Sequence, residues 1–508
     1  MTDLDLEDFT ELQAGRREWN AGRVDSALAA FDLAIRRRPK NVRGLVEFAR
    51  ALGQQHEILR AEELLENALL LCRGHAAASI VVAQAFRSIF RQQRALELFT
   101  SLRQRGQMPT PILGELAVLF EQCGQWEEAF DAISECVSLA PHRNEPKLIL
   151  ARILRNQGKF DESERCLQRL IDVADAAPML LVGCWSELCQ IRDHRGEYDL
   201  AVTAIEKAKQ ILRELPGSRS LMAQSQRINQ LFARLYSEID SATIRRWHSK
   251  RFRPQHAEVG GIAHLIGFPR SGTTLLEQIL DAHPAIVSAP ERVVFSKLIF
   301  PQICQHNGRA MISAAALNSV PEEILHQQAA RYLRLHQEIH GEPWNGRTHL
   351  DKNPNHMSLL AGLLRLSPES RFIVALRDPR DVIVSAYLRY LPISEFSVQF
   401  LDWESACQLY AREMQIWHRM REAMDGNWIE VRYEDTVADP RQQAERVIEF
   451  LGLDWSDHVM AFRERTAGKV INSPSQAEVR KPLYTRSIGR WQNYADHIAP
   501  YLELLPDL

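Results

Sequence analysis

The sequence has little of what marks several large classes of protein. Its eight cysteines are scattered through 508 residues, with no Cys-x-x-Cys pair and no histidine cluster at zinc spacing. No segment reaches 18 uninterrupted apolar residues, about the length that a membrane-spanning helix needs. These absences argue against a disulfide scaffold, a zinc module and a membrane span. We interpret the cysteines as reduced core thiols.

An excess of charge of either sign is also missing. Lysine and arginine number 62 against 65 aspartate and glutamate residues, which gives a formal net charge of -3. A protein that binds nucleic acid or a membrane surface usually carries a basic excess, so we expect neither partner, and any anion site must be local. The N-terminal segment is acidic and lacks a basic region followed by an apolar run. We therefore expect a cytoplasmic protein.

The first half of the sequence contains a repeat. A small residue is followed by a large apolar residue at +4 and a small or apolar one at +7, and this triplet recurs at 34-residue steps. The triplet begins at Ala27, Ala61, Ala95, Ala129, Ser163 and, after a four-residue insertion, Ala201. Glycine stands five residues before four of these anchor residues, and proline twelve residues after two of them. The pattern predicts a pair of antiparallel helices in each unit, held close by the small residue.

This pattern resembles the tetratricopeptide repeat, and it predicts an all-helical solenoid of about six repeats within residues 1–240. Residues 219–238 are expected to form a capping helix. Such solenoids present a concave surface that commonly holds an extended peptide, so we expect an acceptor protein or peptide in that groove. A basic connecting segment at 241–260 should lead to a second domain at 261–508.

From residue 262 the pattern changes to short apolar runs followed by turns and helical stretches, which predicts an α/β domain with a parallel sheet. After the first run, 262–266, Gly267 and Gly272 have the spacing of a phosphate-binding loop that opens a helix. Thr273 stands where a nucleotide triphosphatase carries its lysine, which argues against ATP or GTP hydrolysis. The loop therefore predicts a P-loop-like phosphate site.

A second apolar run, 372–376, ends at Arg377 and leads into a predicted helix bearing Ser385 and Arg389. An arginine at this strand end would oppose a bound metal ion. Positive groups at Arg377, Arg380 and Arg389 suit a second phosphate instead.

Three segments together resemble the sulfotransferase family: residues 268–275, the Arg377 and Ser385 pair, and the Arg-Tyr-Glu-Asp run at 432–435. The nearest resemblance is to the tyrosylprotein sulfotransferase branch, joined to tetratricopeptide repeats as in bacterial fusion proteins. It covers about residues 260–495. The resemblance implies a transferase that uses 3′-phosphoadenosine 5′-phosphosulfate (PAPS), releases adenosine 3′,5′-bisphosphate and requires no metal.

The resemblance also implies roles for individual residues. Those that match the donor-binding residues of the family are Arg270, Ser271, Gly272, Thr273, Thr274, Arg377, Ser385, Arg389, Tyr433, Ser487 and Arg490. It implies that Glu291 is the catalytic base, and that Lys352 and Arg270 are cations on the transferring group. On the residues alone, Glu291 beside Arg292 is more often an exposed ion pair than a base.

One position departs from the branch. Residues 481–491 align without gaps on its donor-closing loop, but the serine that acts on the transition state there falls on Gly489. Ser487, Arg486 or the Gly489 N–H could replace that serine. The departure leaves the identity of the acceptor open.

Three functions are compatible with the sequence. The first is a PAPS-dependent sulfotransferase acting on a hydroxyl group of a protein tyrosine docked by the repeats, or of a sugar or lipid. The second is a P-loop kinase or nucleotidase, and the third is a repeat scaffold with an idle nucleotide-binding domain. Thr273 in the lysine position counts against the second, and the combination of the loop with Glu291 and Lys352 counts against the third.

Overall fold

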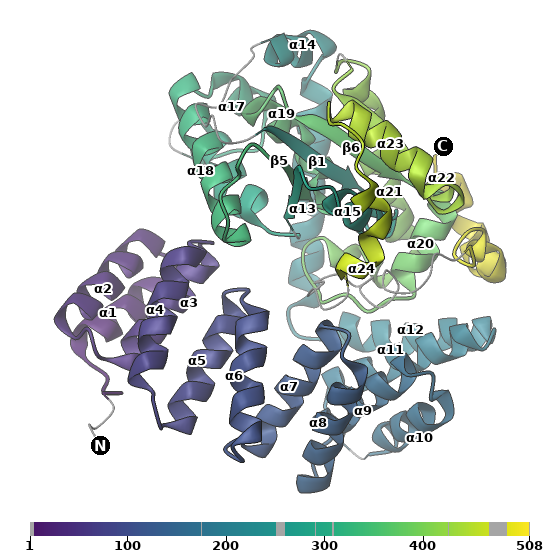
Figure 1. Ribbon diagram of the computed structural model, residues 1–508. Helices are drawn as coiled ribbons and strands as arrows, with labels where there is room; N and C mark the ends of the chain where they lie inside the picture. Colours follow the sequence, from purple (N-terminus) through teal and green to yellow (C-terminus); the bar gives the residue numbers. More distant parts are fainter. Residues whose placement is uncertain are drawn as a thin grey trace. The chain divides into compact units, whose positions relative to one another are not determined.

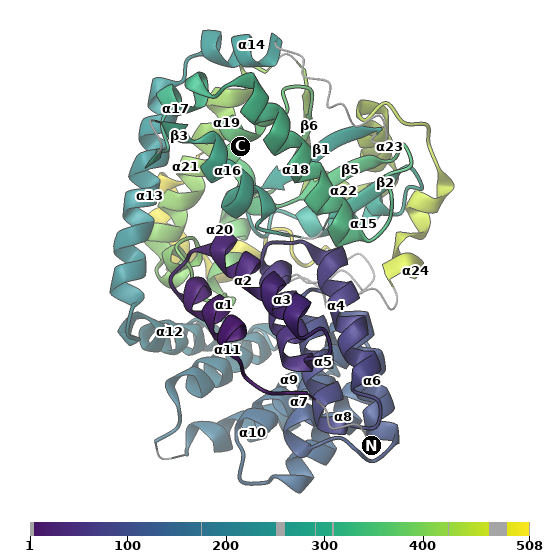
Figure 2. The same ribbon diagram turned by 90° about the vertical axis from the view of Figure 1, so that its left-hand side faces the viewer.

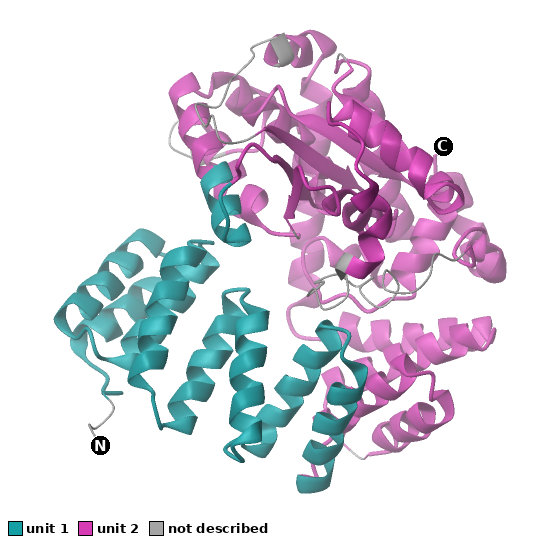
Figure 3. Ribbon diagram, viewed as in Figure 1, with its two compact units in different colours: residues 1–139, 332–343 teal, residues 140–331, 344–508 magenta. Residues whose placement is uncertain are grey.

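The computed structural model describes residues 5–173, 175–249, 260–289, 291–306, 309–424, 426–466 and 485–506. The chain divides into two compact units (Figure 3). Unit 1 consists of residues 1–139 and 332–343, and unit 2 of residues 140–331 and 344–508. Unit 2 holds every residue of the predicted catalytic and donor-binding set.

Consecutive helix pairs make up the first half of the chain (Figure 1). The pairs in unit 1 are α1 (Thr10–Asn20) with α2 (Val24–Arg37), α3 (Val42–Gln54) with α4 (Ile58–Leu71), α5 (Ala76–Ser88) with α6 (Gln92–Gln104), and α7 (Thr110–Gln122) with α8 (Trp126–Leu139). Unit 2 continues with α9 (Glu145–Asn156) and α10 (Phe160–Ile171), then α11 (Pro178–His194) and α12 (Tyr198–Glu214). Helix α13 (Ser218–Glu238) follows at the predicted capping position. Of the predicted connecting segment, 241–249 form α14 (Ser241–Ser249), and 250–259 lie outside the described residues.

The predicted anchor residues all lie on the second helix of their pair, and all are fully buried: Ala27, Ala61, Ala95, Ala129, Ser163 and Ala201. Ser163 shows the direction in which they point, because its hydroxyl donates to the Ala151 carbonyl oxygen on the partner helix α9 at 2.6 Å. A larger side chain there would hold the two helices apart. The predicted helical repeat is confirmed.

The turn inside each pair requires a backbone with positive φ. The residue five places before the anchor adopts it in every described pair: Gly22, His56, Phe90, Gly124, Gly158 and Gly196. Two of these are not glycine, with φ of 59° at His56 and 67° at Phe90. Their rings stack on each other with centroids 5.7 Å apart, a contact that offsets the steric cost of this conformation.

The second domain is built on a parallel sheet, which in the described ranges has the strand order β2-β5-β1-β6-β7. The strands are β1 (Gly261–Gly267), β2 (Ile286–Ala289), β5 (Thr348–Lys352), β6 (Arg371–Leu376) and β7 (Trp428–Arg432). Every neighbouring pair in this sheet is parallel. The two strands predicted from the sequence are β1 and β6, which lie side by side. The predicted α/β domain is confirmed.

Helices cover the sheet. Helices α15 (Thr273–Asp281) and α23 (Pro440–Phe450) are among them (Figure 2). These two helices bury Leu276, Ile279 and Val447 in one cluster with Leu265 of β1 and Ile373 of β6. The remaining helices are α16 (Phe300–Ile303), α17 (Ala314–Ser319), α18 (Glu322–His340), α19 (Leu360–Leu366), α20 (Pro379–Tyr387), α21 (Trp403–Arg421), α22 (Tyr433–Ala438), α24 (Phe462–Thr466) and α26 (Ala495–Ile498). A short antiparallel pair, β3 (Gln305–His306) and β4 (Arg309–Ala310), stands apart from the sheet.

Within unit 2, the last repeat packs against the sheet domain through buried polar contacts. Lys209 on α12 is 3% exposed and donates to the Phe400 carbonyl oxygen. Its ammonium also lies 3.6 Å from the centroid of the Tyr387 ring. One turn further along α12, Arg213 donates to the Leu401 carbonyl oxygen at 2.7 Å. Two cations of the repeat helix therefore satisfy two successive carbonyl groups of the sheet domain.

The burial of Lys209 predicts a pH-dependent cost to stability. Burial lowers the pKa of Lys209 to about 7, whereas the unfolded chain keeps a value near 10.5. Below pH 7 the folded protein must bury a full positive charge, and this cost falls as the pH rises from 7 to 10.5. Relative to Lys209→Met, the unfolding free energy of the wild type should therefore rise by about 1 to 3 kcal/mol between pH 6 and pH 9.

Urea unfolding at the two pH values measures this difference. Lys207→Met, at an exposed lysine of the same helix, is the control and should show no such change. An equal stability gap at both pH values for Lys209→Met would mean that Lys209 keeps its charge in the folded protein up to pH 9, because the Phe400 carbonyl oxygen and the Tyr387 ring compensate for its burial.

Candidate active site

The predicted site residues lie where the parallel strands end. Strand β1 ends at Gly267, β5 ends at Lys352, and Arg377 and Tyr433 directly follow β6 and β7. Glu291 follows β2 by two residues. Because parallel strands end at the same edge of a sheet, these segments converge there, and this edge is where open α/β sheets bind their ligands.

The loop after β1 has a conformation that depends on glycine. Gly272 has a φ of 94° and is the N-cap of α15, which begins at Thr273. A Cβ atom on Gly272 would lie 2.6 Å from Cδ2 of Tyr433, so the loop and the end of β7 are in close contact. The N–H groups of the first turn of α15 therefore begin immediately after the loop, an arrangement suited to an anion.

The hydroxyl residues of this loop are buried. Ser271, Thr273 and Thr274 are 3%, 4% and 6% exposed. The Ser271 hydroxyl donates to the Phe268 carbonyl oxygen at 2.7 Å, which closes the loop on itself. This contact gives Ser271 a role in loop shape in addition to the predicted donor contact.

The structure brings Arg270, Arg377 and Ser385 together. Arg270 Nε donates to Ser385 Oγ at 3.0 Å, and Arg377 Nη1 donates to the Arg270 carbonyl oxygen at 3.1 Å. Arg270 itself has a positive φ of 76°. Residues that are more than 100 positions apart in sequence thus form one hydrogen-bonded group between the loop and α20.

Arg377 is held from several sides. Its side chain is 6% exposed, its guanidinium carbon lies 4.8 Å from the centroid of the Tyr433 ring, and its Nη2 lies 3.7 Å from the Asp381 carboxylate. Burial lowers the pKa of Arg377, and the Asp381 charge acts in the opposite direction. Arg377 Nε is buried and has no hydrogen-bond partner among the described residues. A phosphate oxygen would supply that partner, so these residues fit a phosphorylated donor.

The predicted catalytic pair is in contact. Lys352 Nζ donates to Glu291 Oε1 at 2.6 Å. The side-chain amide of Asn353 donates to the Arg292 carbonyl oxygen at 2.9 Å, which ties the Glu291 segment to the end of β5. The Lys352 side chain is 2% exposed, whereas that of Glu291 is 27% exposed. The Glu291 carboxylate is therefore accessible to a bound molecule, whereas the Lys352 ammonium is buried.

Sequence reasoning missed a third member of this cluster, Glu277 on α15. Its Oε2 lies 3.2 Å from Lys352 Nζ, and the Ser288 hydroxyl donates to its Oε1 at 3.3 Å. Burial alone would lower the pKa of Lys352, but the charges of Glu277 and Glu291 outweigh it, and the pKa is raised. Lys352 therefore stays charged. The sequence did contain a signal for Glu277, because it is a carboxylate inside the apolar helical run at residues 275–280.

Two predicted donor contacts lie against the last repeat. Arg490 Nη2 donates to Asp193 Oδ1 on α11 at 2.6 Å. Arg389 lies two residues beyond the end of α20, not on the helix as predicted, and it lines a small cavity with Lys209 of α12. Sequence spacing could not reveal these neighbours, because they come from about 180 to 300 residues away. A donor contact for either arginine stays a prediction.

The segment that departs from the tyrosylprotein branch is described from residue 485 onward, and 481–484 lie outside the described residues. The N–H groups of Gly489 and Trp491 donate to the two carboxylate oxygens of Asp381, each at 2.8 Å. The Gly489 N–H is thus already engaged in this structure. This disfavours it as the replacement for the family serine, and Ser487 and Arg486 stay candidates.

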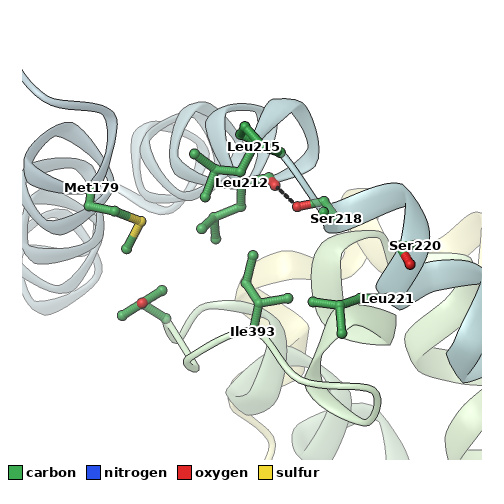
Figure 4. A pocket seen from close by; sticks show the side chains of 10 residues that line it. Met179, Leu212, Leu215, Ser218, Ser220, Leu221 and Ile393 are labelled. Atoms are coloured by element: carbon green, nitrogen blue, oxygen red, sulfur yellow. Dashed lines mark hydrogen bonds between the residues drawn. The ribbon is translucent and has the colours of Figure 1, made fainter. Parts of the chain in front are cut away.

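A separate apolar pocket of about 510 Å³ lies between the end of α12, the start of α13 and the segment after α20 (Figure 4). Its lining includes Met179, Leu212, Leu221 and Ile393, and none of the predicted catalytic residues. We found no group of three or more histidine, cysteine, aspartate or glutamate side chains that could hold a metal ion in the described parts of the chain. Of the helices in those parts, none combines the length and the apolarity needed to cross a bilayer.

Two family models match the chain. The one described as "Sulfotransferase family" matches residues 264–457, and a tetratricopeptide repeat model matches residues 148–178. The predicted resemblance is therefore confirmed: the chain joins tetratricopeptide repeats to a region that matches the sulfotransferase family.

The chain is also similar to individual proteins. An uncharacterized protein of Aquifex aeolicus (strain VF5) is 24% identical over 423 residues, which cover 81% of this chain and 52% of that protein. Protein-tyrosine sulfotransferase 2 of Gallus gallus is 28% identical over 261 residues, which cover 47% of this chain and 67% of that protein. Among solved structures, the sulfotransferase domain of the Synechococcus PCC 7002 olefin synthase aligns with a TM-score of 0.34 and 19% identity, over 51% of this chain and 100% of that domain. The chain spans about half the length of the first of these relatives.

The contact between Gly272 and Tyr433 can be tested by substitution. We expect Gly272→Ala to destabilise the protein by about 1 to 3 kcal/mol more than Gly217→Ala does, because only the first introduces a clash. The two glycines have nearly the same φ, 94° and 91°, but a Cβ at Gly217 would meet no described atom within 4 Å. Urea unfolding of both variants measures the difference. Equal losses would mean that the Tyr433 ring moves aside at no cost.

Proposed function

We propose that this protein transfers a sulfuryl group from PAPS to a hydroxyl group, and that the acceptor is a tyrosine of a protein docked by the repeats. The observation that carries the proposal is the contact of Glu291 with Lys352 at the same sheet edge as the loop and the Arg270, Arg377 and Ser385 group. The family match and the similarity to protein-tyrosine sulfotransferases support the reaction class.

The donor carries two separate anionic groups, and the chain offers a cation for each. Arg270 and the first turn of α15 suit the 5′-phosphosulfate. Arg377 and Ser385 suit the 3′-phosphate, where a guanidinium and a hydroxyl both donate to phosphate oxygens. The hydrogen bond from Arg270 to Ser385 must break when the donor binds. Arg270 is then available to the 5′-phosphosulfate and Ser385 to the 3′-phosphate. Tyr433, which lies against Arg377, would border the adenine ring.

The reaction needs a base and a fixed positive charge. Glu291 accepts the proton of the acceptor hydroxyl while the oxygen of that hydroxyl forms a bond to sulfur. The bond from sulfur to the phosphate oxygen breaks, and its electron pair leaves with adenosine 3′,5′-bisphosphate. Lys352 and Arg270 stabilise the charge on the leaving oxygens. Before proton transfer, Lys352 must release Glu291, and Glu277 keeps the ammonium in place when it does.

The proposal includes a cytoplasmic location. The structure has all eight cysteines as free thiols, and all are buried except Cys166, which is half-buried. Buried, unpaired thiols are typical of proteins in a reducing compartment, which supports this part of the proposal. The release of a soluble bisphosphate product is compatible with the same compartment. We also propose that the transfer step requires no metal ion.

The donor assignment predicts separate losses at two sites. We expect Arg270→Ala and Arg377→Ala each to weaken the binding of adenosine 3′,5′-bisphosphate by about 1.5 to 3 kcal/mol, the range for a hydrogen bond to a charged group. Titration calorimetry measures this, with ATP as the comparison ligand and Arg441→Ala, at an exposed arginine of α23, as the control. Unchanged affinity in both site variants, or equal binding of ATP, would remove the donor assignment and favour a nucleotidase or an idle module.

The acceptor and the base can be tested in one assay. With sulfur-labelled PAPS and an extract of the source cells, label should enter the protein fraction and be recovered as tyrosine sulfate after alkaline hydrolysis. Glu291→Gln should slow this transfer by roughly 100- to 10,000-fold with donor affinity nearly unchanged, because the amide keeps the shape and loses the basicity. Glu445→Gln, an exposed carboxylate on α23, is the control.

Two outcomes of that assay would count against parts of the proposal. Label in the carbohydrate or lipid fraction alone would refute the protein acceptor while keeping sulfuryl transfer. A Glu291→Gln rate within a few-fold of the wild type would show that the base lies elsewhere.

A further inference from the structure

The last repeat reaches the C-terminal segment of the sheet domain through one carboxylate. Asp193, at the end of α11, accepts hydrogen bonds on the same oxygen, Oδ1, from Arg490 Nη2 at 2.6 Å and from the Tyr494 hydroxyl. Tyr494 is 1% exposed, and the edge of its ring contacts the ring of Tyr198 on α12, with centroids 5.2 Å apart. Residues 490–494 are thus docked on the two helices of the last repeat.

The same segment also contacts residues on the donor side of the domain. Asp381 on α20 accepts from the N–H groups of Gly489 and Trp491, and its side chain is fully buried. Arg377 Nη2 donates to the Ser487 carbonyl oxygen. The turn at 485–491 is therefore bound both by Arg377 and Asp381 of the sheet domain and, through Arg490, by Asp193 of the last repeat.

Helix α11 also contacts the helix that carries Ser385. The Gln190 side chain donates at 2.8 Å to the carbonyl oxygen of Leu388, the C-cap residue of α20. One helix of the last repeat thus holds both α20 and the turn that rests on it. The two contacts involve two different elements of the group around Arg377, the end of α20 and the turn at 485–491.

Arg490 and Tyr494 both keep their protons near neutral pH. Burial works to lower the pKa of Arg490, but the Asp193 carboxylate outweighs it, and the pKa is raised. Burial, with the help of Asp193, raises the pKa of Tyr494, so the phenol keeps its proton and continues to donate. Arg490 is therefore engaged with a repeat helix by a charge-assisted bond in this structure.

We propose that Asp193 is a positioning residue of the donor site: through Arg490 and Tyr494 it holds the 485–491 turn against Arg377, so that the last repeat completes the site for the 3′-phosphate. The inference rests on the proposed use of PAPS. It assigns to the repeats a role in donor binding, in addition to the proposed docking of an acceptor. It also replaces the predicted direct contact of Arg490 with the donor by an indirect one.

The full-length Asp193→Asn variant tests the inference, because the amide keeps the size of the side chain and loses its charge. We expect adenosine 3′,5′-bisphosphate to bind about 5- to 20-fold more weakly, a usual range for coupling between sites. The donor KM should rise by a similar factor with kcat nearly unchanged, since Glu291 and Lys352 are untouched. Hydrogen exchange of the 485–494 amides should become faster, while exchange in the sheet strands stays the same.

Asp199→Asn is the matched control. Asp199 pairs with His497 in the same part of the molecule, and its side chain is 93% exposed. Neither affinity nor exchange should change in this variant. If Asp193→Asn does not fold, Tyr494→Phe removes one of the two hydrogen bonds to Asp193 and should give a smaller effect in the same direction.

A double-mutant cycle separates the indirect role of Arg490 from a direct one. If Asp193 acts in part through Arg490, the loss of affinity in the combined Asp193→Asn and Arg490→Gln variant should be smaller than the sum of the two single losses. Additive losses, or tighter binding by Asp193→Asn because it releases the guanidinium, would overturn the inference in favour of a direct donor contact.

The failure of this inference differs from the failure of the proposed function. A wild-type protein that does not bind adenosine 3′,5′-bisphosphate would refute the use of PAPS. Normal binding by the wild type, together with unchanged affinity and unchanged exchange at 485–494 in Asp193→Asn, would refute only the positioning role of Asp193.

Discussion

The candidate site depends on one constraint: parallel strands must end at the same edge of their sheet. The strands β1, β2, β5, β6 and β7 are separated by long stretches of chain, yet the residue that follows each of them lies at this edge. The sheet therefore assembles the loop after β1, two carboxylates, a lysine and an arginine without any local sequence signal that joins them. The helix N-terminus of α15 and the tight contact of Gly272 with Tyr433 add the backbone geometry that the loop needs.

A second physical requirement then shapes the site, because each charge that the edge buries needs partners. Lys352 is satisfied by Glu291 and Glu277, and its charge is retained by that pair. Arg377 has Asp381, the ring of Tyr433 and two carbonyl oxygens, yet its Nε still has no partner in the described residues. The contrast separates the two ends of the site. At the lysine end, the buried ammonium has two carboxylate partners, whereas the arginine end is left with capacity for an anion.

The sequence predicts the parts of this protein that depend on short-range patterns. The anchor residues, the turn glycines, the strands β1 and β6 and the loop before Thr273 all follow from spacing within a few tens of residues, and all are found as expected. His56 and Phe90 show a limit, since their positive φ is compensated by a ring contact between neighbouring repeats that no single repeat reveals. Glu277, Arg389 and Arg490 show another, because their surroundings come from distant helices. A resemblance to a family can indicate which residue is important, but it cannot indicate a neighbour that the family does not share.

The division of the chain into two compact units also depends on contacts between residues that are distant in sequence. A repeat contacts its neighbours along the solenoid, so nothing in the periodic pattern separates the repeats of unit 1 from those of unit 2. The separation comes from residues that lie outside the pattern: Lys209 and Arg213 bind carbonyl oxygens of the sheet domain, and Asp193 binds Arg490. Lys209 and Arg213 lie on α12, which has a buried anchor residue like those of the other repeats. Their contacts join residues 140–240 to the compact unit that holds the candidate site. A repeat can therefore keep its helical pattern while its outer residues are used to build a neighbouring site, and such residues are where a functional link between repeats and enzyme should be sought.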